Sequence, residues 1–96
     1  MEEFNLIREW AAKRGIYDCG DPKTQYIKLQ EEAGELAKAL LKKDEPEIVD
    51  AIGDCVIVLV SLAELCGYKL ENCIKSSWGE IKNREGKMDN GTFKKN

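Results

Sequence analysis

The chain has 96 residues with four cysteines, no histidine and a formal net charge of −3 at pH 7. This length predicts a single domain, spanning residues 1–96. The acidic balance argues against a duplex nucleic-acid partner, which normally requires a basic surface. Without histidine or any CxxC spacing, a zinc site is not expected, and reduced thiols are favoured.

The start of the chain and its longest apolar run also exclude two classes of protein. Glu2 and Glu3 contradict the basic start of a signal peptide. The apolar run from Cys55 to Leu62 is too short to span a bilayer. We therefore expect a cytoplasmic protein with no membrane partner.

The first predicted helix covers residues 4–14, where apolar side chains recur every three or four positions until Gly15. Tyr17 to Gly20 is predicted to be a connection. Asp21 and Pro22 then form a typical helix start, with Asp as the N-cap. The second helix is expected to run from Pro22 to about Lys42, with one apolar stripe: Tyr26, Leu29, Ala33, Leu36, Ala37 and Leu40.

The polar side of this second helix carries three carboxylates within five residues, Glu31, Glu32 and Glu35. Their spacings place them on one side of a helix, where like charges oppose helix formation by about 0.2–0.5 kcal/mol per pair. Gln25 and Lys28 continue the stripe. A cation with oxygen ligands would relieve this repulsion, although a solvated face explains these three acids alone equally well.

The third predicted helix, from about Glu45 to Cys66, is the most apolar element and is hydrophobic nearly all round after Cys55. Such a helix must be covered on every side, so oligomerisation is expected to complete the fold. Asp50 and Asp54 interrupt it, and buried acids are rare unless paired or metal-bound. A short link makes the second and third helices antiparallel neighbours. Their acids then face one another and suit Mg²⁺ or Mn²⁺.

The fourth predicted helix runs from Leu70 to Arg84. The remaining residues, Glu85 to Asn96, contain two glycines and several lysines and are expected to form an extended or loosely held tail. The pattern as a whole predicts an all-α protein of the four-helix-bundle type.

The sequence resembles the MazG-like all-α nucleoside triphosphate pyrophosphohydrolases over nearly its whole length. The motif Glu-Glu-x-x-Glu of that family is present at Glu31, Glu32 and Glu35. Asp50-Ala51-Ile52-Gly53-Asp54 corresponds to its Glu-Glu-Leu-Gly-Asp. Further matching pieces are Trp10-Ala11 with Arg14-Gly15, Gln25-x-x-Lys28-Leu29 and Trp78-x-x-Ile81-x-x-Arg84-x-Gly86-x-Met88.

The resemblance implies Mg²⁺-dependent hydrolysis of an NTP or dNTP between its α- and β-phosphates, with Mn²⁺ as a substitute metal. The oligomer expected from the apolar third helix is a homodimer or homotetramer. Glu32, Glu35, Asp54 and Asp50 are the expected metal ligands, and Glu31 is expected to orient or deprotonate the attacking water. The expected substrate-binding residues are Gln25, Lys28, Trp10, Asn83, Arg84 and Lys87, the last three from the fourth helix or from a neighbouring subunit.

One departure from the family pattern keeps other interpretations open. Ala51 occupies the place of a ligating glutamate, and Asp50 is the expected substitute, ranked ahead of Glu47, whose position as a capping residue has a structural explanation. A non-catalytic helical oligomerisation or regulatory module is therefore an alternative, as is a phosphoribosyl-ATP pyrophosphohydrolase. Base and sugar preference depend on pocket shape and do not follow from the motifs.

Overall fold

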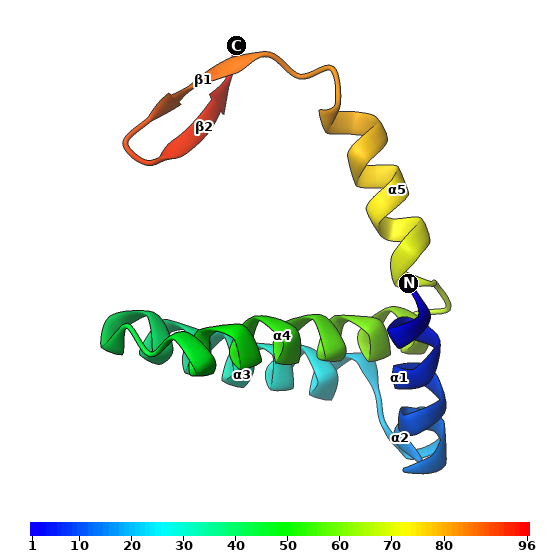
Figure 1. Cartoon of the computed structure of the whole chain (residues 1–96). Helices are drawn as coiled ribbons and strands as arrows, with labels where there is room; N and C mark the ends of the chain where they lie inside the picture. The colour runs from blue at the N-terminus through cyan, green and yellow to red at the C-terminus, as the bar shows by residue number, and fades with distance from the viewer.

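The computed structural model describes all 96 residues and contains five helices followed by a two-stranded hairpin (Figure 1). The elements in chain order are α1 (Glu2–Lys13), α2 (Ile16–Cys19), α3 (Pro22–Lys42), α4 (Glu45–Leu65), α5 (Leu70–Ile81), β1 (Gly86–Asp89) and β2 (Thr92–Lys95). The predicted all-α class is confirmed. None of the helices combines the length and the apolar composition needed to cross a membrane.

The two long helices, α3 and α4, start where capping side chains satisfy free backbone N–H groups. The Asp21 carboxylate accepts hydrogen bonds from the Thr24 backbone N–H at 2.9 Å and from the Thr24 hydroxyl at 2.8 Å. The Asp44 carboxylate accepts from the backbone N–H of Glu47 at 3.3 Å. Only Lys43, in the left-handed conformation, and Asp44 separate the two helices. The helices therefore turn back on each other and lie side by side (Figure 1).

The face of α3 that packs against α4 differs from the predicted apolar stripe. Its buried and half-buried residues step by four and three positions, as in a coiled-coil seam: Gln25, Leu29, Glu32, Leu36 and Ala39. Four residues of the predicted stripe are exposed instead: Tyr26, Ala33, Ala37 and Leu40. The packing contact thus selects a face that contains Glu32 and leaves a second apolar face of α3 uncovered.

The remaining helices meet the C-terminal half of α4. α1 and the single turn α2 pack on α4, and Val60, Ala63 and Leu70 form a small core with flanking apolar side chains from α1 and α4. α2 replaces part of the predicted connection after Gly15, whose φ of +77° is a left-handed conformation that glycine adopts readily. This turn brings Ile16 against α4.

α5 and the hairpin form an arm that projects from the rest of the chain (Figure 1). The backbone of α5 lies close only to that of α4, its first turn is also held by side chains of α1, and the two strands lie close only to each other. α5 ends at Ile81, three residues before the predicted end at Arg84, and the predicted extended tail is paired as a hairpin. Asn90 and Gly91 both have positive φ, as a two-residue hairpin turn requires. The Asn-Gly pair was the sequence signal for this turn.

The start of α5 is fixed by a group of charged side chains between α1, α4 and α5. The Arg8 guanidinium donates hydrogen bonds to both oxygens of the Glu71 carboxylate, at 2.9 and 2.6 Å. Arg8 Nε lies 3.8 Å and Lys69 Nζ 3.5 Å from Glu64 Oε1. The Arg8 contact lowers the pKa of Glu71 to about 2. Arg8 therefore holds the arm by a bidentate, charge-assisted contact.

This contact predicts a pH-dependent stability. Because the pKa of Glu71 is lower in the folded chain than its ordinary 4.5, its ionised form stabilises the fold above pH 4.5. That stabilisation is lost as the pH falls through the window between 4.5 and about 2. Glu71→Gln should therefore lower the free energy of unfolding at pH 7. The difference from wild type should shrink below about half by about pH 3.

Urea denaturation of both proteins at several pH values measures the difference, and Glu80→Gln, on the exposed last turn of α5, is the matched control. A Glu71→Gln effect that is the same at all pH values would contradict the role of the ion pair.

Candidate functional site

A groove of about 470 Å³ lies between α3 and α4 and is closed by residues of α1 and α2. Its lining residues are Trp10 and Ile16 from α1 and α2, Thr24, Gln25, Lys28 and Glu32 from α3, and Asp54, Ile57, Val58 and Ser61 from α4. The contributions of α3 and of α4 each recur at helical spacing, so each set lies on one face of its helix. The groove therefore follows the seam between the two long helices.

The two ends of this groove differ in chemical character. One end carries Lys28, Glu32 and Asp54, and the other carries neutral polar groups, Gln25 and Ser61, with apolar walls. Gln25 and Glu32 are seven residues apart on α3, and Asp54 and Ser61 are seven apart on α4. At 1.5 Å per residue the charged and neutral ends are about 10 Å apart on both walls. The groove thus has a charged end and a nearly neutral end.

Lys28 joins two of the three predicted carboxylates of α3. Its Nζ lies 3.4 Å from Glu32 Oε1 and 3.5 Å from Glu31 Oε2. The contact with Glu32 is the main cause of a raised Lys28 pKa. Glu32 is mostly buried at the seam, with a side chain 17% exposed, whereas Glu31 is 64% exposed at its margin. Lys28 consequently supplies the positive charge nearest to the carboxylates.

Asp54 lies in an environment that disfavours its charge. Burial raises the pKa of Asp54, and the negative charges of Asp50, one turn earlier on α4, and Glu32, across the seam, raise it further. The positive charge of Lys28 lowers the pKa of Asp54, but its effect is smaller than each of those that raise it. The structure therefore brings Glu32, Asp50 and Asp54 close enough to repel one another, with more negative charge than Lys28 neutralises.

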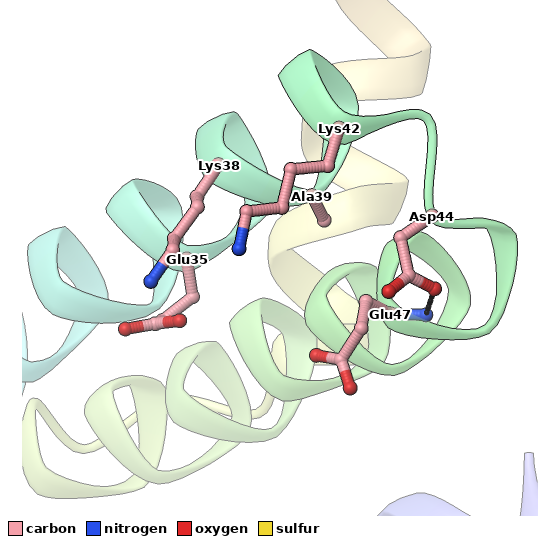
Figure 2. A pocket seen from close by; sticks show the side chains of 6 residues that line it. All are labelled: Glu35, Lys38, Ala39, Lys42, Asp44 and Glu47. Atoms are coloured by element: carbon pink, nitrogen blue, oxygen red, sulfur yellow. Dashed lines mark hydrogen bonds between the residues drawn. The ribbon is translucent and has the colours of Figure 1, made fainter.

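Glu35 lies closer to the α3–α4 link, in a second pocket of about 270 Å³. Figure 2 shows Glu35 reaching from α3 toward α4, with Lys38 and Lys42 on the same helix and Glu47 on α4. Asp44 completes this pocket and holds the start of α4 through the Glu47 N–H. The carboxylates are thus divided between the group around Asp54 and a second pocket, which Glu35 and Glu47 line from opposite helices.

The donor atoms at the charged end are carboxylate oxygens, the ligands that Mg²⁺ and Mn²⁺ prefer. Burial raises the pKa of Asp54 and the neighbouring carboxylates raise it further, and a divalent cation at this position would oppose both effects. The side chains as they stand do not form a ligand shell, because no three of the carboxylates are placed to hold a metal ion together. Lys28 instead occupies the position next to Glu32. Chemistry and charge fit the cation, whereas the present side-chain positions do not yet surround one.

Trp10 lines the groove from α1 and is 46% exposed. The guanidinium carbon of Arg14 lies 4.2 Å from the ring centroid, and Nη1 donates a hydrogen bond to the Trp10 carbonyl oxygen at 3.3 Å. This cation–π contact holds the indole at the groove wall. Trp10 therefore offers an aromatic ring to a ligand at the groove wall.

The other three predicted substrate-binding residues do not reach the groove of their own chain. Asn83 and Arg84 follow α5, and Lys87 lies in β1. All three are exposed, and neither α5 nor the hairpin contacts α3. The arm would have to meet another chain to bring them to such a groove.

Sequence reasoning missed several lining residues, of which Ser61 is the most distinctive. It is the only serine in the apolar run from Cys55 to Leu62, and it is 3% exposed. A polar residue inside an apolar run was a usable signal. Ile16, Ile57 and Val58 carried no comparable signal, because apolar walls and apolar cores use the same residue types.

Two comparisons with known proteins found matches. The family model of the MazG nucleotide pyrophosphohydrolase domain matches residues 21–88. An uncharacterized 18.2 kDa protein in the rep-hol intergenic region of Haemophilus phage HP1 (strain HP1c1) is 43% identical over 58 residues. These residues are 60% of this chain and 36% of the phage protein, so the chain spans about a third of the length of that relative. No solved structure matches the chain.

The repulsion around Asp54 predicts that its charge destabilises the chain when divalent metal is removed. Asp54→Asn should raise the melting temperature in EDTA at pH 7 by up to a few degrees. The gain should shrink toward acidic pH, since the raised pKa of Asp54 lets the wild type lose this charge as well. Added Mg²⁺ should stabilise the wild type more than the variant.

Thermal denaturation in EDTA and in Mg²⁺ measures these differences, with Asp18→Asn on α2 as an exposed control. A lower melting temperature for Asp54→Asn in EDTA would contradict the repulsion.

Proposed function

We propose that this chain, which belongs to the MazG nucleotide pyrophosphohydrolase domain family, hydrolyses a nucleoside triphosphate to the monophosphate and pyrophosphate with Mg²⁺ or Mn²⁺. The observation that carries the proposal is the groove with a charged and a neutral end about 10 Å apart. A nucleotide has the same polarity, with charged phosphates at one end and a nearly neutral base at the other. The charged end suits metal and phosphates, and the neutral end suits the nucleoside.

The proposed metal ligands are Glu32, Asp54, Asp50 and Glu35. When bound, the metal supplies neutralisation of phosphate charge and activation of a water molecule. The repulsion at Asp54 supports this assignment, because a cation would relieve it. The position of Glu35 beside Glu47 supports the ligation of Glu35 less directly, since it requires a change in side-chain direction.

The other residues of the groove have roles that follow from their chemistry. Glu31, exposed at the margin of the carboxylates and held by Lys28, is the proposed base that orients or deprotonates water. Lys28 is the proposed phosphate contact, because its ammonium already faces the charged end. Gln25 would donate to a phosphate or to the base, and Trp10 would stack on the base.

Ala51 favours the non-catalytic alternative more than any other residue does. It is 5% exposed and lies where the family motif has a ligating glutamate. A helical oligomerisation or regulatory module would retain the fold without this ligand. The test of function must therefore be able to give a negative answer.

That test is a panel of NTPs and dNTPs, together with phosphoribosyl-ATP, incubated with the whole chain and Mg²⁺, Mn²⁺ or EDTA. We expect pyrophosphate and the matching monophosphate in equal amounts from at least one nucleotide, with no release in EDTA. Ion-exchange chromatography of the products measures both. Release from no substrate would leave the non-catalytic module as the function, and release from phosphoribosyl-ATP alone would select that enzyme.

Variants of the carboxylates test the same proposal at the level of single residues. Glu35→Gln and Asp54→Asn should abolish hydrolysis while the helical content is retained. Asp50→Asn should be severe and Glu47→Gln mild, and Glu80→Gln serves as the control outside the groove. The reverse order for Asp50 and Glu47 would assign the second motif to Glu47, which shares a pocket with Glu35.

The enzyme is also proposed to be a homodimer or homotetramer. Large apolar side chains that are more than 45% exposed include Tyr26, Ile27, Leu40 and Leu41 on α3, Val49 and Ile52 on α4, and Ile74, Trp78 and Ile81 on α5. Patches of this kind normally mark protein interfaces. Residues 82–96 carry five basic and two acidic side chains, which complements the acidic end of the groove. A second copy of the arm would supply Asn83, Arg84 and Lys87.

Subunit complementation tests this arrangement. Arg84→Ala and Asp54→Asn should each be inactive as pure oligomers. Unfolding and refolding the two together should restore part of the activity, because one mixed site contains both wild-type residues. Sedimentation velocity should show an oligomer in each sample. A monomeric wild type at micromolar concentration, or no recovery in a mixed oligomer, would contradict the shared site.

A further inference from the structure

Ser61 is the buried polar side chain at the neutral end of the groove. It is 3% exposed and is the only polar or charged residue that is buried in the whole chain. It lies on the groove face of α4 with Asp54, Ile57 and Val58. A hydroxyl enclosed by apolar walls needs a partner, because an unmade hydrogen bond in such a place is costly.

Tyr17 of α2 lies next to Ser61 but does not line the groove. Its hydroxyl is buried close to Ser61, without a hydrogen bond of normal geometry. Glu64 and Arg8 are its charged neighbours. The Tyr17 hydroxyl thus lies buried beside Ser61, and of these two residues only Ser61 lines the groove. Tyr17 is placed to orient the Ser61 hydroxyl but not to touch a ligand.

We infer that Ser61 forms the hydrogen bond that recognises the nucleoside part of the substrate, and that Tyr17 is its positioning residue. The inference rests on the proposed function and deepens it. If the phosphates occupy the charged end, the base or sugar reaches about 10 Å further along α4, where Ser61 is the polar group on that wall. A hydroxyl both donates and accepts, so it can meet the polar edge of a base or a sugar hydroxyl.

Because its surroundings are apolar, the Ser61 hydrogen bond can discriminate between ligands that pair with the hydroxyl and ligands that do not. Ile16, Ile57 and Val58 line the groove beside Ser61, which is 3% exposed. A buried polar group that the wrong ligand leaves unpaired costs binding free energy. Phosphate binding at the other end does not involve Ser61. Removing its hydroxyl should therefore weaken ligands that contain a nucleoside and leave ligands without one unchanged.

The experiment compares two probes by calorimetry with the whole chain and Mg²⁺. One probe is a set of nucleoside α,β-imidotriphosphates, which resist cleavage, and the other is inorganic tripolyphosphate. Ser61→Ala should weaken the binding of the preferred nucleotide about 3- to 10-fold and leave tripolyphosphate unchanged. Ser77→Ala, on exposed α5, is the matched control. If Ser61→Ala does not fold, Ser61→Cys provides the same comparison.

Tyr17→Phe separates positioning from direct contact. Alone it should weaken nucleotide binding by less than Ser61→Ala does. The double variant Tyr17→Phe/Ser61→Ala should bind the nucleotide as well as Ser61→Ala alone, since Tyr17 acts only through Ser61. Additive losses would overturn the positioning role.

Two results would overturn the role of Ser61: the same nucleotide affinity for Ser61→Ala and wild type, or an equal weakening of nucleotide and tripolyphosphate binding in Ser61→Ala. These outcomes are distinct from failure of the proposed function, in which the wild type cleaves no nucleotide at all.

Discussion

The antiparallel packing of α3 against α4 is the contact on which the rest of the structure depends. The two-residue link of Lys43 and Asp44 forces the helices together, and a seam with coiled-coil spacing joins them. This seam places Glu32 opposite Asp54 at one level and Gln25 level with Ser61 two turns away. α1 and α2 then close the groove because they pack on α4. Without the seam there is neither a groove nor a reason for its acids to meet.

The seam also holds two carboxylates, Glu32 and Asp54, where burial makes their charge costly, and the exposed Asp50 lies one turn from Asp54. Glu32, Asp50 and Asp54 share one region, and Lys28 offsets only part of their repulsion. A chain selected only for stability would place apolar residues at such seam positions. The retained acids therefore support a bound cation, and Glu35, which lines a separate pocket with Glu47, must change its side-chain direction to join the ligands.

The arm formed by α5 and the hairpin is a second feature that a single chain leaves incomplete. Arg8 and Glu71 fix the start of the arm, yet every residue of the arm after Glu71 is exposed. The exposed apolar side chains of the arm complement the uncovered apolar surfaces of α3 and α4, and its basic end complements the acidic end of the groove. An oligomer in which arms and grooves meet accounts for both surfaces with one contact. An isolated two-stranded hairpin is also marginal in water, which favours the same arrangement.

Local sequence signals determined the helices that carry the site. Asp21-Pro22 and Asp44 marked two helix starts, and the Glu31, Glu32 and Glu35 motif identified the family. Only the tertiary structure decided which face of α3 is buried, because several of its faces are apolar enough to pack and the contact with α4 selects one. It also divided the carboxylates into two groups and kept Asn83, Arg84 and Lys87 away from the groove. Helical periodicity places residues on a face, but the distance between two faces depends on how the helices dock.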